Sequence, residues 1–230
     1  MLMNRVEREA RVTADSFDAI AGAAVAHLEQ MYSRSAIILH SVYQLPIDEP
    51  HKTYVAVLTN ALKSLSAALA LLRMGWRLQP YSCLRNGIEA TSVIIHLVAH
   101  PNDLQKFKAG KLDVPKTLKA AKTAIPSIGK LYGMLTEEFV HVGKPFWHLQ
   151  KGNIYSDSEW QMWQCLAAIA FFALIIFIVS ELALYELVPE RHCWKRQGDG
   201  SFKQIWSMEV KQWREEFVTL YRQHYRGEII

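Results

Sequence analysis

Cysteine is scarce in this sequence, which contains three among its 230 residues. Cys83, Cys165 and Cys193 lie far apart and form no CxxC pair, so neither a disulfide framework nor a cysteine zinc site is expected. Residues 1–12 are charged and lack the apolar centre of a signal peptide. These absences together predict a cytoplasmic protein.

The sequence also lacks the short motifs of several large protein classes. It contains no Walker-type glycine loop, no GxSxG and no dinucleotide fingerprint. No segment alternates between apolar and polar residues over the length of a strand. Common ATPases, hydrolases, Rossmann enzymes and β-rich folds are therefore disfavoured.

What the sequence does contain is apolar residues at helical spacing over most of its length. Breaks fall at prolines and glycines, as at Pro46, Gly75 and Pro101. We expect a series of helices over 2–12, from Asp15 or Ser16 to Tyr43, and over 51–73, 80–99, 126–143, 157–187 and 203–226, with short helices between 101 and 125. This pattern predicts an all-α protein, an up-and-down helical bundle with four or five long helices.

The longest apolar run covers fifteen residues without a charge, from Cys165 to Val179. A membrane span needs about 20 predominantly apolar residues, and Ser180 and Glu181 interrupt this run early. We therefore expect a buried central helix and no stable membrane insertion. For the whole chain we expect a bundle domain over 1–188, followed over 189–230 by a small loop or hairpin and a C-terminal helix packed on the bundle.

Two short polar clusters are set into apolar helices. The first contains Arg85, Asn86 and Glu89, and the second contains Tyr132, Glu138 and His141, with Lys144 just beyond. Charged groups on core-facing helices are costly unless they find partners, so the two clusters are expected to meet. The spacings of four between Arg85 and Glu89, and of three between Glu138 and His141, each place two side chains on one helix face.

The clusters allow two interpretations. In one, they form an interhelical ion-pair network that only fixes the register of the helices. In the other, Arg85 binds a phosphate and His141 is the general acid or base, oriented by Glu89 or Glu138. Such a group could cleave RNA without a metal by activating a ribose hydroxyl. The residues that would contact the substrate are then Asn86, Tyr132 and Lys144.

The net charge of +4 is a mild excess that leaves RNA, protein and small-molecule partners open. A metal site is a further possibility, because Glu138-x-x-His141 has the ligand spacing of di-iron bundles. Those sites use two such motifs, and no second ExxH occurs in the sequence. We therefore expect no metal and no cofactor.

Residues 71–98 and 131–141 carry a resemblance to a known group of proteins. An Arg-x-x-x-Glu helix followed by a Tyr-x-x-Leu-Thr-x-x-x-x-His helix resembles a family of helical bacterial proteins that is itself similar to the HEPN group. HEPN proteins are four-helix bundles that include ribonuclease toxins and antiviral effectors. The resemblance, which covers about residues 50–185, implies a role in prokaryotic defence or toxin–antitoxin systems, and a homodimer or a partner protein. It carries over four site residues: Arg85, Glu89, Tyr132 and His141.

The sequence departs from active HEPN nucleases at their signature, an Arg followed by His after four to six residues on one helix. The matching pair here, Arg34 and His40, lies in the first long helix, away from both clusters. We expect a solvated Arg34 and a packed His40. The leading hypothesis is thus a HEPN-like ribonuclease or RNA binder, and the alternative is a non-enzymatic interaction module with a structural polar cluster.

Overall fold

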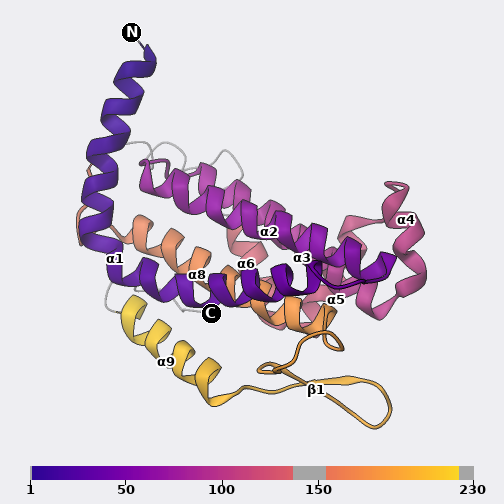
Figure 1. The fold of residues 1–230 in the computed structure, drawn as a ribbon. Helices are drawn as coiled ribbons and strands as arrows, with labels where there is room; N and C mark the ends of the chain where they lie inside the picture. Colours follow the sequence, from indigo (N-terminus) through magenta and orange to yellow (C-terminus); the bar gives the residue numbers. More distant parts are fainter. Residues whose placement is uncertain (1, 137–153, 223–230) are drawn as a thin grey trace.

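The longest apolar run folds into a helix that is covered on all sides. The computed structural model describes residues 2–136 and 154–222, and in it α8 (Trp160–Ala183) runs between the other long helices (Figure 1). Every residue from Met162 to Ala183 is buried. A helix that is apolar around its whole circumference needs neighbours on each side to cover it. The predicted buried central helix is confirmed.

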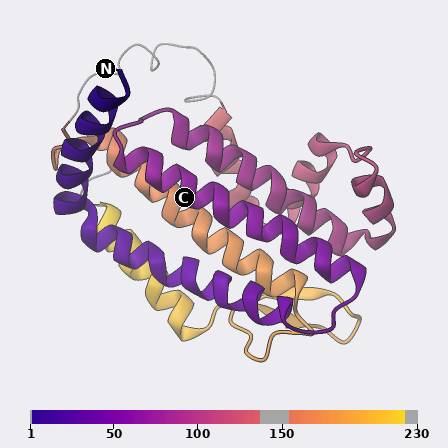
Figure 2. The same cartoon turned by 45° about the horizontal axis from the view of Figure 1, so that its top comes forward.

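Three further long helices contact α8. They are α1 (Leu2–Tyr43), α2 (Glu49–Arg73) and α3 (Gln79–Ala99), and Figure 2 shows them alongside it. Short connections at 44–48 and 74–78 make α1, α2 and α3 successive antiparallel neighbours. Together with α9 (Met208–Arg222), these helices confirm the predicted all-α up-and-down bundle.

Of the described helices, α2 and α8 are long and apolar enough, by length and composition, to cross a membrane. In this fold 94% of the most apolar stretch of α8 is buried, against 39% of the corresponding stretch of α2. The helix α8 therefore supplies the core, and α2 supplies a covering layer with an outward face.

Capping residues and prolines set the ends of α2 and α3 within two residues of the predicted positions. The Asp48 carboxylate accepts a hydrogen bond from the backbone N–H of His51 at 3.0 Å and so caps α2. Gly75 follows the end of α2 with a φ of +90°, a left-handed conformation that favours glycine. Pro80 occupies the first turn of α3, where its missing N–H has no intrahelical role.

The N-terminal helix differs from the prediction. It continues unbroken from Leu2 to Tyr43, whereas two helices were expected. Ser16 does not cap a new helix, because its hydroxyl donates to the carbonyl of Thr13 at 2.8 Å and accepts the backbone N–H of Tyr155 at 3.1 Å. Since no proline or glycine lies between residues 2 and 21, nothing in the backbone forces a stop.

Short helices follow α3 and fold back against it. They are η1 (Pro101–Asp103), α4 (Leu104–Lys108), α5 (Val114–Ala124) and α6 (Pro126–Met134). The helix α5 packs along α3, and α6 contacts both. This arrangement brings the start of the second polar cluster to the first. The predicted continuation of α6 to residue 143 lies, from residue 137 on, outside the described residues.

A small hairpin follows α8, within the part of the chain that the structure describes. The strands β1 (Trp194–Arg196) and β2 (Phe202–Gln204) pair antiparallel, with Lys195 opposite Lys203. Gly200 in the connecting turn has a φ of +84°. Because β2 takes up residues 202–204, the last helix begins at Met208 and not at 203 as predicted.

The helix α9 packs across α1 through an aromatic contact. The rings of His27 and Trp213 stack with their centroids 4.3 Å apart. The indole N–H of Trp213 donates to the carbonyl of His27 at 3.0 Å, and His27 Nε2 lies 3.0 Å from the carbonyl of Trp213. Burial lowers the pKa of His27, which favours the neutral ring in this contact.

A buried carboxylate joins α8 to the hairpin. Glu181 is fully buried, and its two oxygens accept backbone N–H groups from His192, Cys193 and Trp194 at 2.8, 2.8 and 2.9 Å. A buried charge is tolerated when hydrogen bonds replace its lost water. Glu181 therefore fixes the backbone of residues 192–194 to the end of α8.

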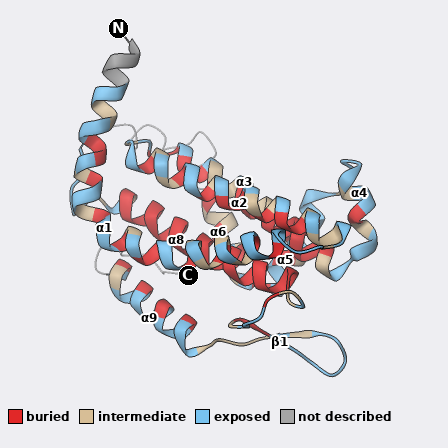
Figure 3. Ribbon diagram, in the orientation of Figure 1, coloured by how far each residue is buried: buried red, intermediate tan, exposed pale blue. Residues whose placement is uncertain are grey.

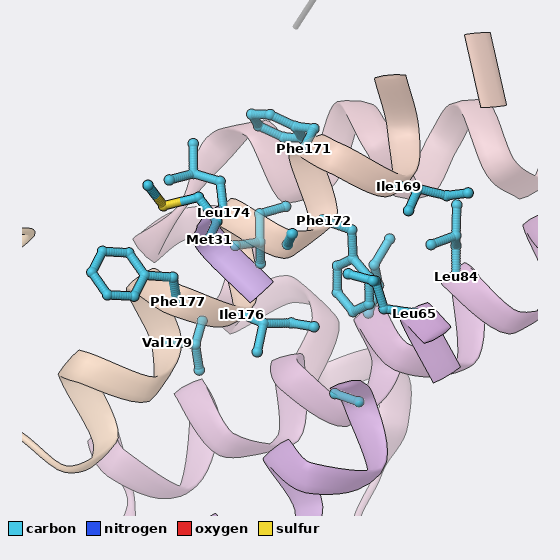
Figure 4. Packing of buried hydrophobic residues seen from close by; sticks show 14 of the residues in the cluster. Met31, Leu65, Leu84, Ile169, Phe171, Phe172, Leu174, Ile176, Phe177 and Val179 are labelled. Atoms are coloured by element: carbon cyan, nitrogen blue, oxygen red, sulfur yellow. The ribbon is translucent and has the colours of Figure 1, made fainter. Parts of the chain in front are cut away.

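Close approach of α3 to α8 depends on a glycine of the first polar cluster. Buried side chains line α8 and the inner faces of its neighbours (Figure 3), and residues of α1, α2, α3 and α8 converge in the core (Figure 4). A Cβ added at Gly87 would lie 2.5 Å from Cε1 of Phe172, a ring that is fully buried. Gly87 is thus a packing residue within Arg85–Glu89.

The Gly87→Ala variant is expected to be less stable than wild type by about 1–2 kcal/mol, because overpacking against Phe172 outweighs the helix propensity that alanine adds. Urea unfolding followed by circular dichroism measures the change. The matched control is Gly22→Ala in α1, where a Cβ would meet nothing within 4 Å. That control is expected to gain about 0.5–1 kcal/mol, and a gain in both variants would contradict the packing role.

The Glu181→Gln variant is expected to lower the free energy of unfolding by about 2–3 kcal/mol. The amide replaces one accepting oxygen by an NH₂ group, which then faces backbone N–H donors. Thermal unfolding measures the loss, and near-UV circular dichroism reports on the Trp194 environment. The control is Glu186→Gln, which removes one exposed charge paired with Arg196 and is expected to change stability by less than about 0.5 kcal/mol. Equal stability of the two variants would exclude this role of Glu181.

Candidate functional site at the junction of α3, α5 and α6

Arg85 and Glu89 form the predicted pair on one face of α3. Arg85 Nε donates to Glu89 Oε1 at 3.1 Å, and the two side chains are 33% and 30% exposed. The hydrogen bond to Glu89 raises the pKa of Arg85 above its ordinary value, with burial opposing the shift. Arg85 therefore stays fully charged, and both side chains remain in contact with solvent.

The helix α6 adds Tyr132 to this pair. The phenol of Tyr132 donates to the same Glu89 oxygen at 3.0 Å, and Arg85 Cζ lies 5.5 Å from the centroid of the Tyr132 ring. Glu89 Oε1 is thus shared by a cation on its own helix and a hydroxyl from a second helix. The expected meeting of the two clusters is realised through Tyr132.

A second cation reaches the tyrosine from α5. Lys122 is exposed, and its Nζ lies 5.7 Å from the Tyr132 ring centroid. Both distances to the ring lie within the range of cation–π attraction. Two positive groups and one carboxylate leave this junction, made of Arg85, Glu89, Lys122 and Tyr132, with one excess positive charge.

The other polar residues of α3 do not belong to this junction. Ser92 Oγ donates to the carbonyl of Ile88, and His96 Nε2 lies 2.9 Å from Asp103 Oδ2. Lys106 and then His96 lower the pKa of Asp103 to about 2. Arg85 and Glu89 therefore belong to one site on α3 and His96 to another, since His96 is directed to η1.

Asn86 is separated from Arg85 although it follows it in sequence. It is exposed and borders a groove of about 720 Å³ between α2 and α3, together with Asn60, Lys63 and Cys83. Successive residues of a helix point about 100° apart, which places Asn86 beside α2 and Arg85 beside α6. The predicted substrate-binding set is consequently not brought together as a whole.

Three predicted site residues lie outside the described residues. They are Glu138, His141 and Lys144. The roles assigned to them, a general acid or base with its orienting carboxylate and a substrate contact, remain predictions. Within the described ranges, 2–136 and 154–222, no group of three His, Cys, Asp or Glu side chains is arranged to hold a metal ion.

The pair Arg34 and His40 differs from its prediction. Arg34 Nη1 makes an ion pair with Glu209 Oε2 of α9 at 2.9 Å, so it is not a purely solvated side chain. His40 is exposed and not packed. The two residues are six apart on α1, and this spacing turns them to different sides of the helix.

Lys122 is the junction residue that the sequence analysis missed. It belongs to a run of lysines between 106 and 122 that is typical of a solvated helix face. Only the fold of α5 against α3 and α6 distinguishes it from the other lysines of this run. The spacing of residues along the chain does not predict that Tyr132 lies close to α5.

No protein-family model, curated protein or solved structure matches this chain. The fold and the junction together define an all-α helical bundle with a positively charged, solvent-accessible polar cluster.

The Tyr132→Phe variant is expected to lose about 0.5–1 kcal/mol, because it removes the hydroxyl bonded to Glu89 and keeps the ring. Chemical unfolding of Tyr132→Phe, Glu89→Gln and the double variant measures the coupling between the two groups. Tyr43→Phe, at a tyrosine that is 70% exposed, is the matched control and is expected to be neutral. Additive losses in the double variant would mean that the two residues act independently.

Proposed function

We propose that this chain is an RNA-binding protein of prokaryotic defence or toxin–antitoxin type, HEPN-like, that holds an RNA phosphate at the junction of α3, α5 and α6. The observation that carries the proposal is the convergence of Arg85, Lys122 and Tyr132 on one solvent-accessible patch. Phosphates are bound in proteins by groups of this kind, a planar guanidinium and an ammonium near an aromatic ring. The patch includes Tyr132 of α6, and His141 follows α6 in the sequence.

The chemistry of each residue suits this role. A guanidinium has five N–H donors, more than the bond from Arg85 to Glu89 uses. Glu89 and Tyr132 orient Arg85, so that little side-chain freedom is lost when a phosphate binds. Lys122 adds a second, exposed positive charge near the ring. An unpaired base can stack on an aromatic ring, which Tyr132 supplies.

RNA cleavage is the further part of the proposal. His141 would take the proton of a ribose hydroxyl, oriented by Glu138, while Arg85 balances the charge that develops on the phosphate. No metal takes part in this scheme. The partners are RNA and either a second copy or another protein chain, in the cytoplasm.

A non-enzymatic interaction module is the second candidate, and one observation favours it. Glu89 Oε1 already accepts hydrogen bonds from both Arg85 and Tyr132. These bonds tie α3 to α6 through one shared carboxylate oxygen. In this case the cluster fixes helix register, and the partner is a protein that binds elsewhere on the bundle.

Fluorescence anisotropy with a labelled single-stranded RNA tests the binding site. Arg85→Ala and Lys122→Ala are each expected to weaken binding about three- to tenfold and to reduce the salt slope by about one, because each removes one phosphate contact. The matched control is Lys116→Ala, an exposed lysine on a different side of α5.

The alternatives predict different results in the same set of variants. If Arg85→Ala lowers the melting temperature and leaves RNA affinity and its salt slope at the wild-type values, the interaction module is supported. For cleavage, His141→Ala is expected to keep RNA affinity and lose hydrolysis of the labelled RNA. Unchanged hydrolysis in His141→Ala would remove that histidine from the proposal.

A further inference from the structure

A second candidate site shares no residue with the junction of α3, α5 and α6. It lies where the connector after α8 passes α1. A cavity of about 340 Å³ opens there. Its floor is apolar and comes from α1, α8 and the connector, and it consists of Ile38, Val42, Phe177, Leu187 and Val188. This volume falls at the lower end of the range for small-molecule sites, and such sites combine an apolar floor with few polar groups.

The wall of this cavity is fixed by hydrogen bonds, so the cavity exists before any ligand binds. The backbone of His192 is held on both sides, since its N–H donates to the Glu181 carboxylate at 2.8 Å and its carbonyl accepts from Ser207 N at 2.8 Å. Leu187 and Val188 donate to the carbonyl of Leu184. A preformed wall reduces the ordering cost of binding.

The rim carries four charged or titratable side chains from three elements. Arg34 Nη1 and His192 Nδ1 both face Glu209 Oε2, at 2.9 and 3.4 Å. Arg34 lowers the pKa of Glu209, so that this carboxylate stays ionised. The charges of Arg34 and Glu209 thus cancel each other at the rim.

After Arg34 and Glu209 are paired, Glu190 is the remaining carboxylate at the rim. Its side chain is 82% exposed, and its Oε2 lies 3.7 Å from His192 Nε2, too far for a hydrogen bond. His192 Nδ1 faces the Glu209 carboxylate at 3.4 Å, so the imidazole lies between the two rim carboxylates. An exposed carboxylate beside an apolar cavity fits one ammonium group.

We infer that this cavity binds a small apolar molecule that carries one positive charge, such as an arylalkylamine. The apolar body would cover Ile37, which is 65% exposed, and would lie against the buried side chains of Phe177 and Val42 at the cavity floor. The ammonium group would donate to the Glu190 carboxylate. The site does not depend on the RNA site, since it shares no residue with it.

Two-dimensional NMR titration of the full chain with phenethylamine tests this site. The matched probes are phenethyl alcohol, which is neutral, and hydrocinnamic acid, which is an anion. Phenethylamine is expected to shift the backbone signals of Ile38, Val42 and His192 and to bind about three- to fivefold more tightly than the alcohol, the range of one exposed charge pair. The acid is expected to bind more weakly than both.

Two variants locate the contacts. Glu190→Gln is expected to remove the preference for the amine over the alcohol, while Glu186→Gln, an exposed carboxylate outside the cavity lining, keeps it. Ser41→Trp places a large ring at an exposed lining position and is expected to abolish binding of both probes with the fold intact. Absence of binding at millimolar phenethylamine, equal binding of amine and acid, or an unchanged preference in Glu190→Gln each overturns the inference.

Discussion

The burial of α8 is the constraint from which the other features follow. A helix with apolar side chains on every side must be covered completely, and α1, α2 and α3 with the elements after residue 100 do this. Each covering helix therefore has one apolar face and one outward face. Apart from the buried carboxylate of Glu181 at the end of α8, the polar sites described above lie where covering elements meet. The junction of α3, α5 and α6 is such a point, and the cavity beside α1 is another.

The helix α3 shows how close packing and a polar site coexist within one turn. Gly87 lets the Phe172 ring approach the backbone of α3, while Arg85 and Glu89, two residues on either side, lie at the edge of the contact with α6. Leu84 and Ile88, which directly precede Arg85 and Glu89 in the sequence, are fully buried. The polar pair is therefore positioned by core packing as well as by its own hydrogen bonds. A rigid α3 gives the guanidinium a defined direction, which is what recognition of a phosphate needs.

The sequence predicted the helices well because their ends depend on local chemistry. Asp48, Gly75 and Pro80 act through their own backbone preferences, which neighbours along the chain do not alter. The division of α1 was wrong since Ser16 bonds to a distant loop through Tyr155, a contact that spacing does not reveal. The two polar clusters could be expected to meet, because charged groups on core-facing helices need partners. Lys122 joins them only through tertiary packing, which spacing along the chain likewise does not reveal. The pairing of His96 with Asp103 likewise depends on how η1 turns back toward α3.

The contact between His27 and Trp213 joins positions 186 residues apart, near the two ends of the described chain. Such a contact closes a very long loop. Long-range contacts of this kind form late in folding, because closing the loop costs chain entropy before the stabilising contacts are made. The helices α2, α3 and α5 instead join neighbours in sequence and can assemble first. We therefore see α9 as the element that closes the molecule after its centre has formed. A nascent chain that still lacks its last residues would have a complete α8, with the strip of α1 around His27 uncovered until α9 arrives.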